Sequence, residues 1–245
     1  MTNLSKKKGE NPPKGQETKK NAISPPLNKT KKENRNNKKH HYKQHNPWRQ
    51  HLLKIILDEQ IDLTQYHIHT LGGKEWHEYH YLVQYGIKFG IETYHNINIG
   101  SIDPLNDPHT KAHPNQDFLD IRWWQHPPRI LAYDSTQALT PNNRHIIQHL
   151  ASIAAYACNQ HPDKTAYLSM NFMLTLEGNI TPEGLKTPQQ LEDEYNTWID
   201  LAENQILARH LKPILLHDQG LITQIQGKNT KMIAIHLKIT HNYYN

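Results

Sequence analysis

The amino-acid sequence predicts an α/β fold in which a doubly wound, mostly parallel sheet ends in an antiparallel hairpin. Three observations lead to this prediction. Apolar residues with the two-residue period of strands alternate along the chain with apolar residues at helical spacing. The last two extended runs follow each other without a helix between them. A strongly basic segment precedes the first periodic stretch, which separates a tail from a domain.

The tail comprises residues 1–45, in which Lys, Asn, Pro, Gln and Thr dominate. Positions 1–50 contain 14 basic and 3 acidic residues, whereas the other 195 positions contain 14 basic and 20 acidic residues. Because so few apolar residues cannot offset the entropy cost of ordering, we predict that the tail is disordered. Residues 46–245 show no second linker and no internal repeat, so we predict a single domain there.

The charge of the tail favours nucleic acid as a partner. Each lysine near a phosphate releases counterions, which gives an affinity that depends on salt and not on sequence. A solubilising role or a localisation signal would explain the same composition. An anionic membrane surface is a further alternative, although the tail shows no amphipathic helix.

The first half of the domain begins with a helix. Asn46-Pro47 can cap and start it, and Trp48, Leu52, Ile55 and Ile56 then share one face. A strand at 65–71, a helix at 74–85, a strand at 91–99 and a loop at 101–118 are expected to follow. In the second of these helices the predicted buried face consists of Trp76, Tyr79, His80 and Val83.

The second half continues the alternation. We predict a strand at 129–134, a helix from Thr140-Pro141, a strand at 165–176, a helix from Thr187-Pro188, and two extended runs at 213–225 and 231–239. Thr187 and Gln190 fit a capping box. Gln226-Gly227-Lys228-Asn229 separates the last two runs, as in a hairpin. The whole order is that of a Rossmann-like sheet.

Composition excludes several classes of protein. The single cysteine, Cys158, rules out an internal disulfide and a four-cysteine zinc site. No apolar run approaches the roughly 18 residues of a membrane span, and no apolar segment of a secretory signal follows the basic start. We therefore expect a cytoplasmic protein. The motifs of P-loop nucleotidases and of serine hydrolases with G-x-S-x-G are absent as well.

Over residues 61–240 this order resembles the class I S-adenosylmethionine-dependent methyltransferases, in particular the small phage and mobile-element type. In that family the first strand runs into a glycine-bearing loop and then a helix, as His67-Ile-His-Thr-Leu-Gly72-Gly73-Lys-Glu-Trp does here. The resemblance implies S-adenosylmethionine as cofactor, held by Leu71, Gly72, Gly73 and Asn96. It also implies a catalytic Asp134, because the fourth family strand ends in an acid or Asn near the transferred methyl group.

The chain departs from the family pattern in three places. The G-x-G-x-G loop is reduced to Leu71-Gly72-Gly73, and the N/D-P-P-Y/F motif is absent. The acid that usually ends the second strand and holds the ribose is missing at Tyr94-His95-Asn96, and Glu92 comes too early. An inactive relative that binds nucleic acid or a partner protein therefore remains an alternative to an active methyltransferase.

Three further residues are candidates for substrate binding. Trp123 and Trp124 form an aromatic pair that could stack on a base, although the pattern favours packing in the domain. Asn171 is a polar residue within an apolar strand, where it could contact substrate or bond a neighbouring backbone group.

The histidines suggest a second alternative. His67-x-His69 places two imidazoles on one face of a strand. Together with His95, this pattern resembles the metal-binding motifs of the PHP-type metal-dependent phosphoesterases, and His126-Pro127 resembles a later His-Pro motif of the same family. That function predicts that His67, His69 and His95 converge on one point. The terminal Asp-x-His of that family is absent, and 19 histidines in 245 residues produce about one or two such pairs by chance. The sequence alone therefore assigns no metal ligands.

Overall fold

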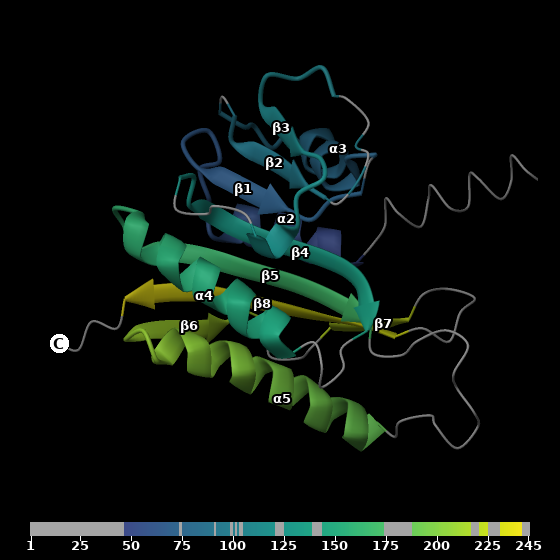
Figure 1. The fold of residues 1–245 in the computed structure, drawn as a ribbon, viewed down its shortest axis with the longest axis vertical. Coiled ribbons are helices and arrows are strands. Elements are labelled where there is room, and N and C mark those ends of the chain that lie inside the picture. The colour runs from purple at the N-terminus through teal and green to yellow at the C-terminus, as the bar shows by residue number, and fades with distance from the viewer. Residues whose placement is uncertain are drawn as a thin grey trace, which may run out of the picture. The chain divides into compact units, whose positions relative to one another are not determined.

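The computed structural model describes residues 47–241, apart from short internal segments (Figure 1). These segments are 74, 91, 99, 101, 103–104, 121–124, 139–143, 174–187, 217–220 and 225–230. The predicted tail, Trp123 and Trp124 therefore lie outside the described residues.

The described elements follow the predicted alternation. The helices are α2 (Pro47–Asp58), α3 (His77–Gln84), the 3-10 turn η1 (Phe118–Asp120), α4 (Arg144–Gln160) and α5 (Pro188–Leu207). The strands are β1 (His67–Thr70), β2 (Tyr94–Ile97), β3 (Thr110–His113), β4 (Pro128–Ala138), β5 (Thr165–Met173), β6 (Leu211–Leu215), β7 (Leu221–Gln224) and β8 (Lys231–His241).

These strands form one mixed sheet in the order β3-β2-β1-β4-β5-β8-β6. The pairs among the first five strands are parallel, whereas β8 is antiparallel to both β5 and β6. The predicted fold class, a mostly parallel sheet that ends in an antiparallel hairpin, is confirmed. One arm of that hairpin is interrupted, because β6 and β7 pair with different parts of β8.

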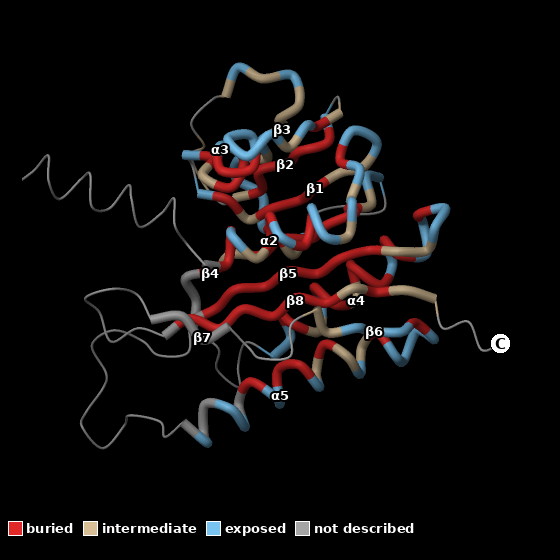
Figure 2. Tube along the Cα trace, turned by 180° about the vertical axis from the view of Figure 1, so that it is seen from behind, coloured by how far each residue is buried: buried red, intermediate tan, exposed pale blue. Residues whose placement is uncertain are grey.

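Helices cover both faces of the sheet, as the tube in Figure 2 also shows. On one face α4 and α5 bury apolar side chains against β4, β5 and β8, for example Leu150 of α4 and Trp198 of α5. On the other face α2 and α3 pack on β1, β2 and β4 through Trp48, Leu52 and Leu82. The predicted apolar face of α2, formed by Trp48, Leu52, Ile55 and Ile56, is buried.

Two predictions about local structure were wrong. The proline-rich segment at 101–118 contains β3, which pairs with β2 at the edge of the sheet. Edge strands are short and need little apolar alternation, so the sequence pattern concealed it. In α3 the buried residues include Tyr81 and Leu82, while His80 and Val83 face solvent. The helix begins at His77 and not at Lys74, which removes the first turn on which the predicted face was based.

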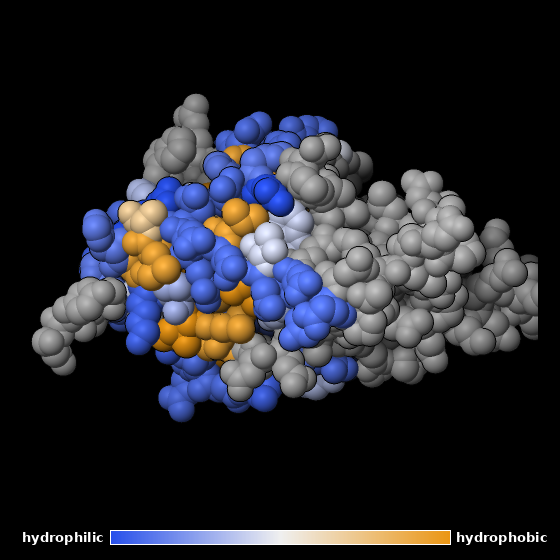
Figure 3. Space-filling view, turned by 90° about the horizontal axis from the view of Figure 1, so that it is seen from below, coloured by the Kyte–Doolittle hydropathy of each residue, from blue (hydrophilic) through white to orange (hydrophobic). Residues whose placement is uncertain are grey.

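The opposite edge of the sheet is β6. Its Lys212 is exposed and its Pro213 has no N–H to offer, and both features discourage pairing with another chain. The surface seen from below is mixed, with apolar patches between hydrophilic side chains (Figure 3). Among the described helices, none combines the length and apolar character that crossing a membrane requires.

The connection from β3 to β4 departs from the doubly wound pattern. Its described residues contain only the 3-10 turn η1 where such a fold usually places a helix. The sheet face over β1, β2 and β3 on the α4 side is therefore covered by loop side chains. This part of the fold holds the polar cluster described below.

Adjacent residues of α3 test the corrected helix face. We expect Leu82→Ala to lower the free energy of unfolding by about 2–5 kcal/mol, because Leu82 is 1% exposed in the core. Val83→Ala should change it by less than about 0.5 kcal/mol, because Val83 is 43% exposed. Urea unfolding of both variants measures the difference, and equal losses would contradict the described orientation of α3.

Candidate functional site

The first candidate site is the crevice at the carboxyl ends of β1 and β4. These strands are neighbours in the sheet, but their connections lead to helices on opposite faces. Open α/β sheets bind ligands at such a switch point. The predicted cofactor loop, Leu71-Gly72-Gly73, leaves β1 at this point and leads to α3.

The structure brings the predicted cofactor residues together. The side-chain amide of Asn96 donates a hydrogen bond to the carbonyl oxygen of Gly73, over 3.0 Å. A Cβ atom on Gly72 would lie 2.6 Å from Oδ1 of Asn96 and 3.1 Å from Oε2 of Glu78. Protein atoms therefore occupy the space beside Gly72, whereas no atom lies within 4 Å of the corresponding position at Gly73. Leu71 packs against the apolar core beneath α4 and α5.

A buried ion pair lies at this edge of the sheet. Nε of Arg49, in α2, donates to Oε1 of Glu78, in α3, over 2.9 Å, and Nη2 of Arg49 also contacts Glu78. Nη2 lies 3.5 Å from Oδ2 of Asp134. Arg49 and Glu78 are both buried, so this pair links α2, α3 and β4 across the switch point.

Asp134, the predicted catalytic residue, belongs to this network. Its Oδ1 accepts a hydrogen bond of 2.6 Å from the side-chain amide of Asn171, which lies beside it in β5. Burial raises the pKa of Asp134 to about 6, although the nearby Arg49 opposes the shift. Asn171 thus bonds a neighbouring side chain, and Asp134 faces an arginine of its own chain.

Sequence reasoning missed Arg49 and Glu78. Each stands near the start of an amphipathic helix, where a charged residue usually faces water, so no local signal identified them. Glu92, weighed as the ribose-binding acid, precedes β2 at the amino end of the strand and lies 3.8 Å from Lys111. At the other end of β2, Ile97 is followed by Asn98.

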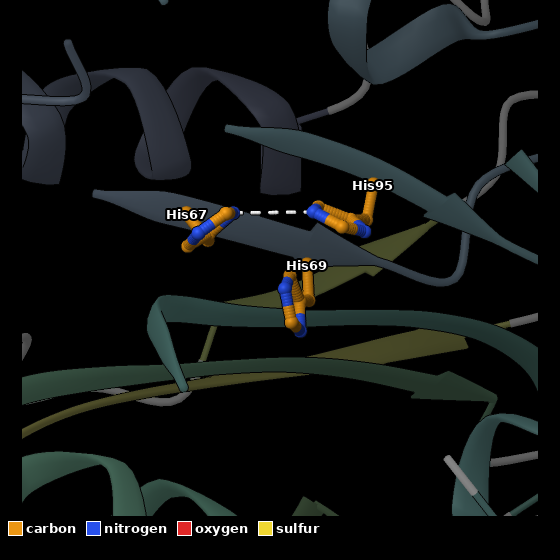
Figure 4. Close-up of side chains that lie close together, drawn as sticks. All are labelled: His67, His69 and His95. Atoms are coloured by element: carbon orange, nitrogen blue, oxygen red, sulfur yellow. Dashed lines mark hydrogen bonds between the residues drawn. The ribbon is translucent and has the colours of Figure 1, made fainter. Parts of the chain in front are cut away.

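The second candidate site is a cluster of histidines on the sheet face below η1. One ring nitrogen from each of His67, His69 and His95 lies within 4.8 Å of the other two, which confirms the convergence that the second alternative predicts. Figure 4 shows the three rings projecting from β1 and β2 toward one another. His69 and His95 are neighbours in register, and His67 lies two residues earlier on the same face.

Further histidines extend this cluster. Nδ1 of His67 lies 3.1 Å from Nε2 of His95, and Nδ1 of His95 lies 3.1 Å from Nε2 of His113 in β3. Nε2 of His95 also lies 3.0 Å from the carbonyl oxygen of Glu92. The ring centroid of His126 is 5.3 Å from that of His67. Sequence reasoning did not include His113, because the strand that carries it was predicted as a loop.

The pKa values of the three converging histidines lie below their ordinary range. Burial lowers the pKa of His95 to about 3, and the neighbouring His67 and His113 add to the shift. Burial is also the main reason why the pKa values of His67 and His69 lie below their usual range. Neutral imidazole is the form that coordinates transition metals.

A cavity of about 400 Å³ adjoins these rings. His69, His95 and His113 form part of its wall. The rest comes from Ile97 and from loop side chains of the connection to β4: Asn115, Gln116, Asp117, Asp120, Gln125 and His126. Side chains of the connection without a described helix thus line an open pocket against the histidine face of the sheet.

Comparison with known proteins adds information about the fold only. No family model matches the chain, and no curated protein matches it. The "putative hemolysin" of Lactococcus lactis is similar in structure over 76% of this chain and 84% of its own, with a TM-score of 0.48 and 11% identity. That of Streptococcus thermophilus is similar over 78% of this chain and 65% of its own, with a TM-score of 0.49 and 11% identity. This chain spans just under two thirds of the second protein.

The pKa shift of His95 predicts how stability depends on pH. The unfolded chain takes up a proton near pH 6.5, while the folded chain resists it until about pH 3. Stability is therefore lost as the pH falls from 6.5 toward 3, and His95 alone accounts for about 2 kcal/mol between pH 7.5 and 5. In chelator-treated buffer, the free energy of unfolding of His95→Asn should therefore fall by about 2 kcal/mol less than that of the wild type between pH 7.5 and 5. Urea unfolding at the two pH values measures this difference.

His210→Asn is the matched control, because His210 is exposed on the turn after α5 and has a φ of 59°, which Asn tolerates. This variant should follow the wild type across the same pH interval. Equal pH dependence in all three proteins would show that His95 accepts a proton in the folded state as easily as in the unfolded chain.

Proposed function

We propose that this chain is a methyltransferase-like protein whose cofactor crevice is closed by its own side chains, and that it acts by binding nucleic acid. The mixed sheet supports the relationship to methyltransferases, because its strand directions are those that the sequence resemblance implies. The state of the crevice supports the loss of methyl transfer. The basic N-terminal segment supports the choice of nucleic acid as partner.

The observation that carries the proposal is the position of Arg49. It reaches from α2 across the carboxyl ends of the strands to Glu78, with Asp134 3.5 Å away. A ligand at the switch point would have to displace this arginine and leave Glu78 buried without its partner. Separating a buried ion pair costs about 3–5 kcal/mol, which weakens any ligand by that amount.

The missing ribose contact points the same way. Methyltransferases of this class hold both ribose hydroxyls with an acid at the end of the second strand. Here β2 ends at Ile97 with Asn98 after it, and Glu92 lies at the opposite end. An amide oxygen can accept hydrogen bonds but lacks the charge of a carboxylate, so the adenosine half of S-adenosylmethionine loses its strongest partner.

Nucleic acid is the partner that the charge distribution favours. The first 50 positions carry a large excess of Lys and Arg, whereas the remainder of the chain carries more acidic than basic residues. Attraction to phosphates therefore comes from the N-terminal segment and not from the domain. Such contacts give an affinity that falls steeply with salt and has little dependence on base sequence.

Calorimetric titration with S-adenosylhomocysteine tests the closed crevice. We expect no binding of the full-length protein with a dissociation constant below about 100 µM. Gly73→Trp fills the open space beside Gly73, and it should also show no binding, because the wild-type protein has no affinity for it to remove. Micromolar binding by the wild type that Gly73→Trp abolishes would establish a working cofactor pocket and overturn the proposal.

Salt titrations with single- and double-stranded oligonucleotides test the role of the basic segment. The tail variant replaces three of its lysines with glutamine: Lys6, Lys7 and Lys8. A matched variant replaces three exposed lysines of the domain: Lys54, Lys88 and Lys212. The tail variant should bind more weakly, and its slope of log affinity against log salt should decrease by about 0.7–0.9 for each phosphate that is no longer neutralised. Equal weakening in both variants would contradict a partner held by the tail.

A further inference from the structure

We propose that His67, His69 and His95 form a binding site for a divalent transition metal ion, with zinc as the first candidate, and that the open side of the ion faces the cavity beneath η1. This site lies on the face of the sheet and not at its carboxyl edge. It therefore goes beyond the proposed function, which concerns the crevice and the tail.

The distances between the ring nitrogens fit one ion. Two ligand nitrogens on a tetrahedral zinc lie roughly 3.3 Å apart, given a Zn–N bond of about 2.05 Å. Nδ1 of His67 and Nε2 of His95 are 3.1 Å apart, and a nitrogen of His69 lies within 4.8 Å of both residues' ligand atoms. One ion shared by all three rings requires the His69 nitrogen to approach the other two by up to about 1.5 Å.

The backbone holds the three residues in place. His67 and His69 alternate with Ile68, which is fully buried on the opposite face, and His95 is next to Tyr94, which is buried in the same way. The strands cannot rotate without exposing these apolar side chains.

His113 is suited to orient His95. Histidines that bind a metal through one nitrogen usually hold the other N–H on a neighbouring acceptor. With Nε2 of His95 toward the ion, Nδ1–H points to Nε2 of His113, 3.1 Å away. Binding through Nε2 gives up the contact of 3.0 Å with the carbonyl oxygen of Glu92, and the bond to the metal replaces it.

Three protein ligands leave one position of a tetrahedral ion open. Structural zinc sites use four protein ligands, whereas sites that exchange a ligand use three. The cavity of about 400 Å³ borders His69 and His95 and is large enough for water and a small ligand. Asp117, Asp120 and His126 on its wall can bond such a ligand. The site is thus of the exchangeable kind.

The same distances without a metal would describe a chain of neutral imidazoles, each donating to the next. Such a chain explains the contacts of His95 with His67 and His113. The ring of His69 lies beside them, with its centroid 4.5 Å from that of His95. An ion that requires a third ligand explains all three residues at once.

Competition between the protein and a chromophoric chelator for Zn²⁺ measures binding by the full chain. We expect one tight site in the wild type. His113→Leu removes the partner of a ligand and should lower the affinity for Zn²⁺ roughly 10- to 100-fold, and His113→Gln should recover part of that affinity. His69→Asn and His95→Asn each remove a ligand and should lower the affinity by more than that. Far-UV circular dichroism of each chelator-treated variant checks its fold.

The basic tail requires its own control, because it contains His40, His41 and His45. Replacing all three with asparagine should leave the tight site intact, and His210→Asn in the domain should do the same. If the tail variant loses the tight site, or if the wild type shows none, the proposal is wrong.

Cobalt tests the geometry independently of any variant. Co²⁺ bound by three nitrogens and water gives visible absorption typical of four or five ligands, and adding thiocyanate should change it, because the anion replaces the water. A spectrum of six-coordinate Co²⁺ would overturn the three-histidine site. A tetrahedral spectrum that thiocyanate does not change would show that the fourth position is closed, which contradicts the open side.

Discussion

The connection between β3 and β4 contains only a 3-10 turn among its described residues, and the histidine site is best understood from this constraint. A helix at this position would bury apolar side chains against β1, β2 and β3. In its place, the strands present His67, His69, His95 and His113, and polar loop side chains close over them around a cavity. Buried imidazoles must satisfy their nitrogens or bind an ion, since burying a polar group without a partner costs about 1–3 kcal/mol. Because a loop and not a helix covers this face, its buried side chains are polar and need hydrogen-bond partners or a bound ion.

On the other face the packing is conventional, and there the polar groups are gathered at one edge. Helices α2 and α3 supply Arg49 and Glu78, which meet above the ends of β1 and β4. A buried ion pair of this kind contributes little net stability, but removing either partner leaves a buried charge. It therefore fixes the arrangement of the two helices, and in the proposed function it also keeps ligands out of the switch point. At this edge Asn96 of β2 lies against the glycine loop. Its side-chain amide donates to the carbonyl oxygen of Gly73, and its Oδ1 lies 2.6 Å from where a Cβ atom on Gly72 would be.

Most of the fold could be predicted from the sequence, because long periodic stretches such as those of α4, α5 and β8 show their buried faces in the residue pattern. Short edge elements could not: β3 has four residues and no buried apolar one, so nothing distinguished it from a loop. The candidate cofactor residues were placed together correctly, since strand ends in a parallel sheet meet at one edge. What closes that edge could not be foreseen, because Arg49 and Glu78 are 29 positions apart and meet only through the packing of α2 on α3. The convergence of His67, His69 and His95 followed from strand alternation and pairing. The part played by His113 could not be predicted, because it depends on β3.

Strand β1 links the two sites physically. It pairs with β2 on one side and β4 on the other, and its four residues alternate between the faces. His67 and His69 share the face on which His69 lines the cavity, Ile68 and Thr70 lie on the face of α2 and α3, and the chain then enters the glycine loop. Shifting β1 by one residue would exchange these sets completely, placing imidazoles in an apolar core and isoleucine in a polar cavity. The apolar packing of Ile68 therefore holds the histidines within reach of one another, and it also sets where Gly72 meets Asn96. An ion bound between β1 and β2 would stabilise the same register from the opposite face, so metal affinity and the packing of the crevice side are expected to rise and fall together.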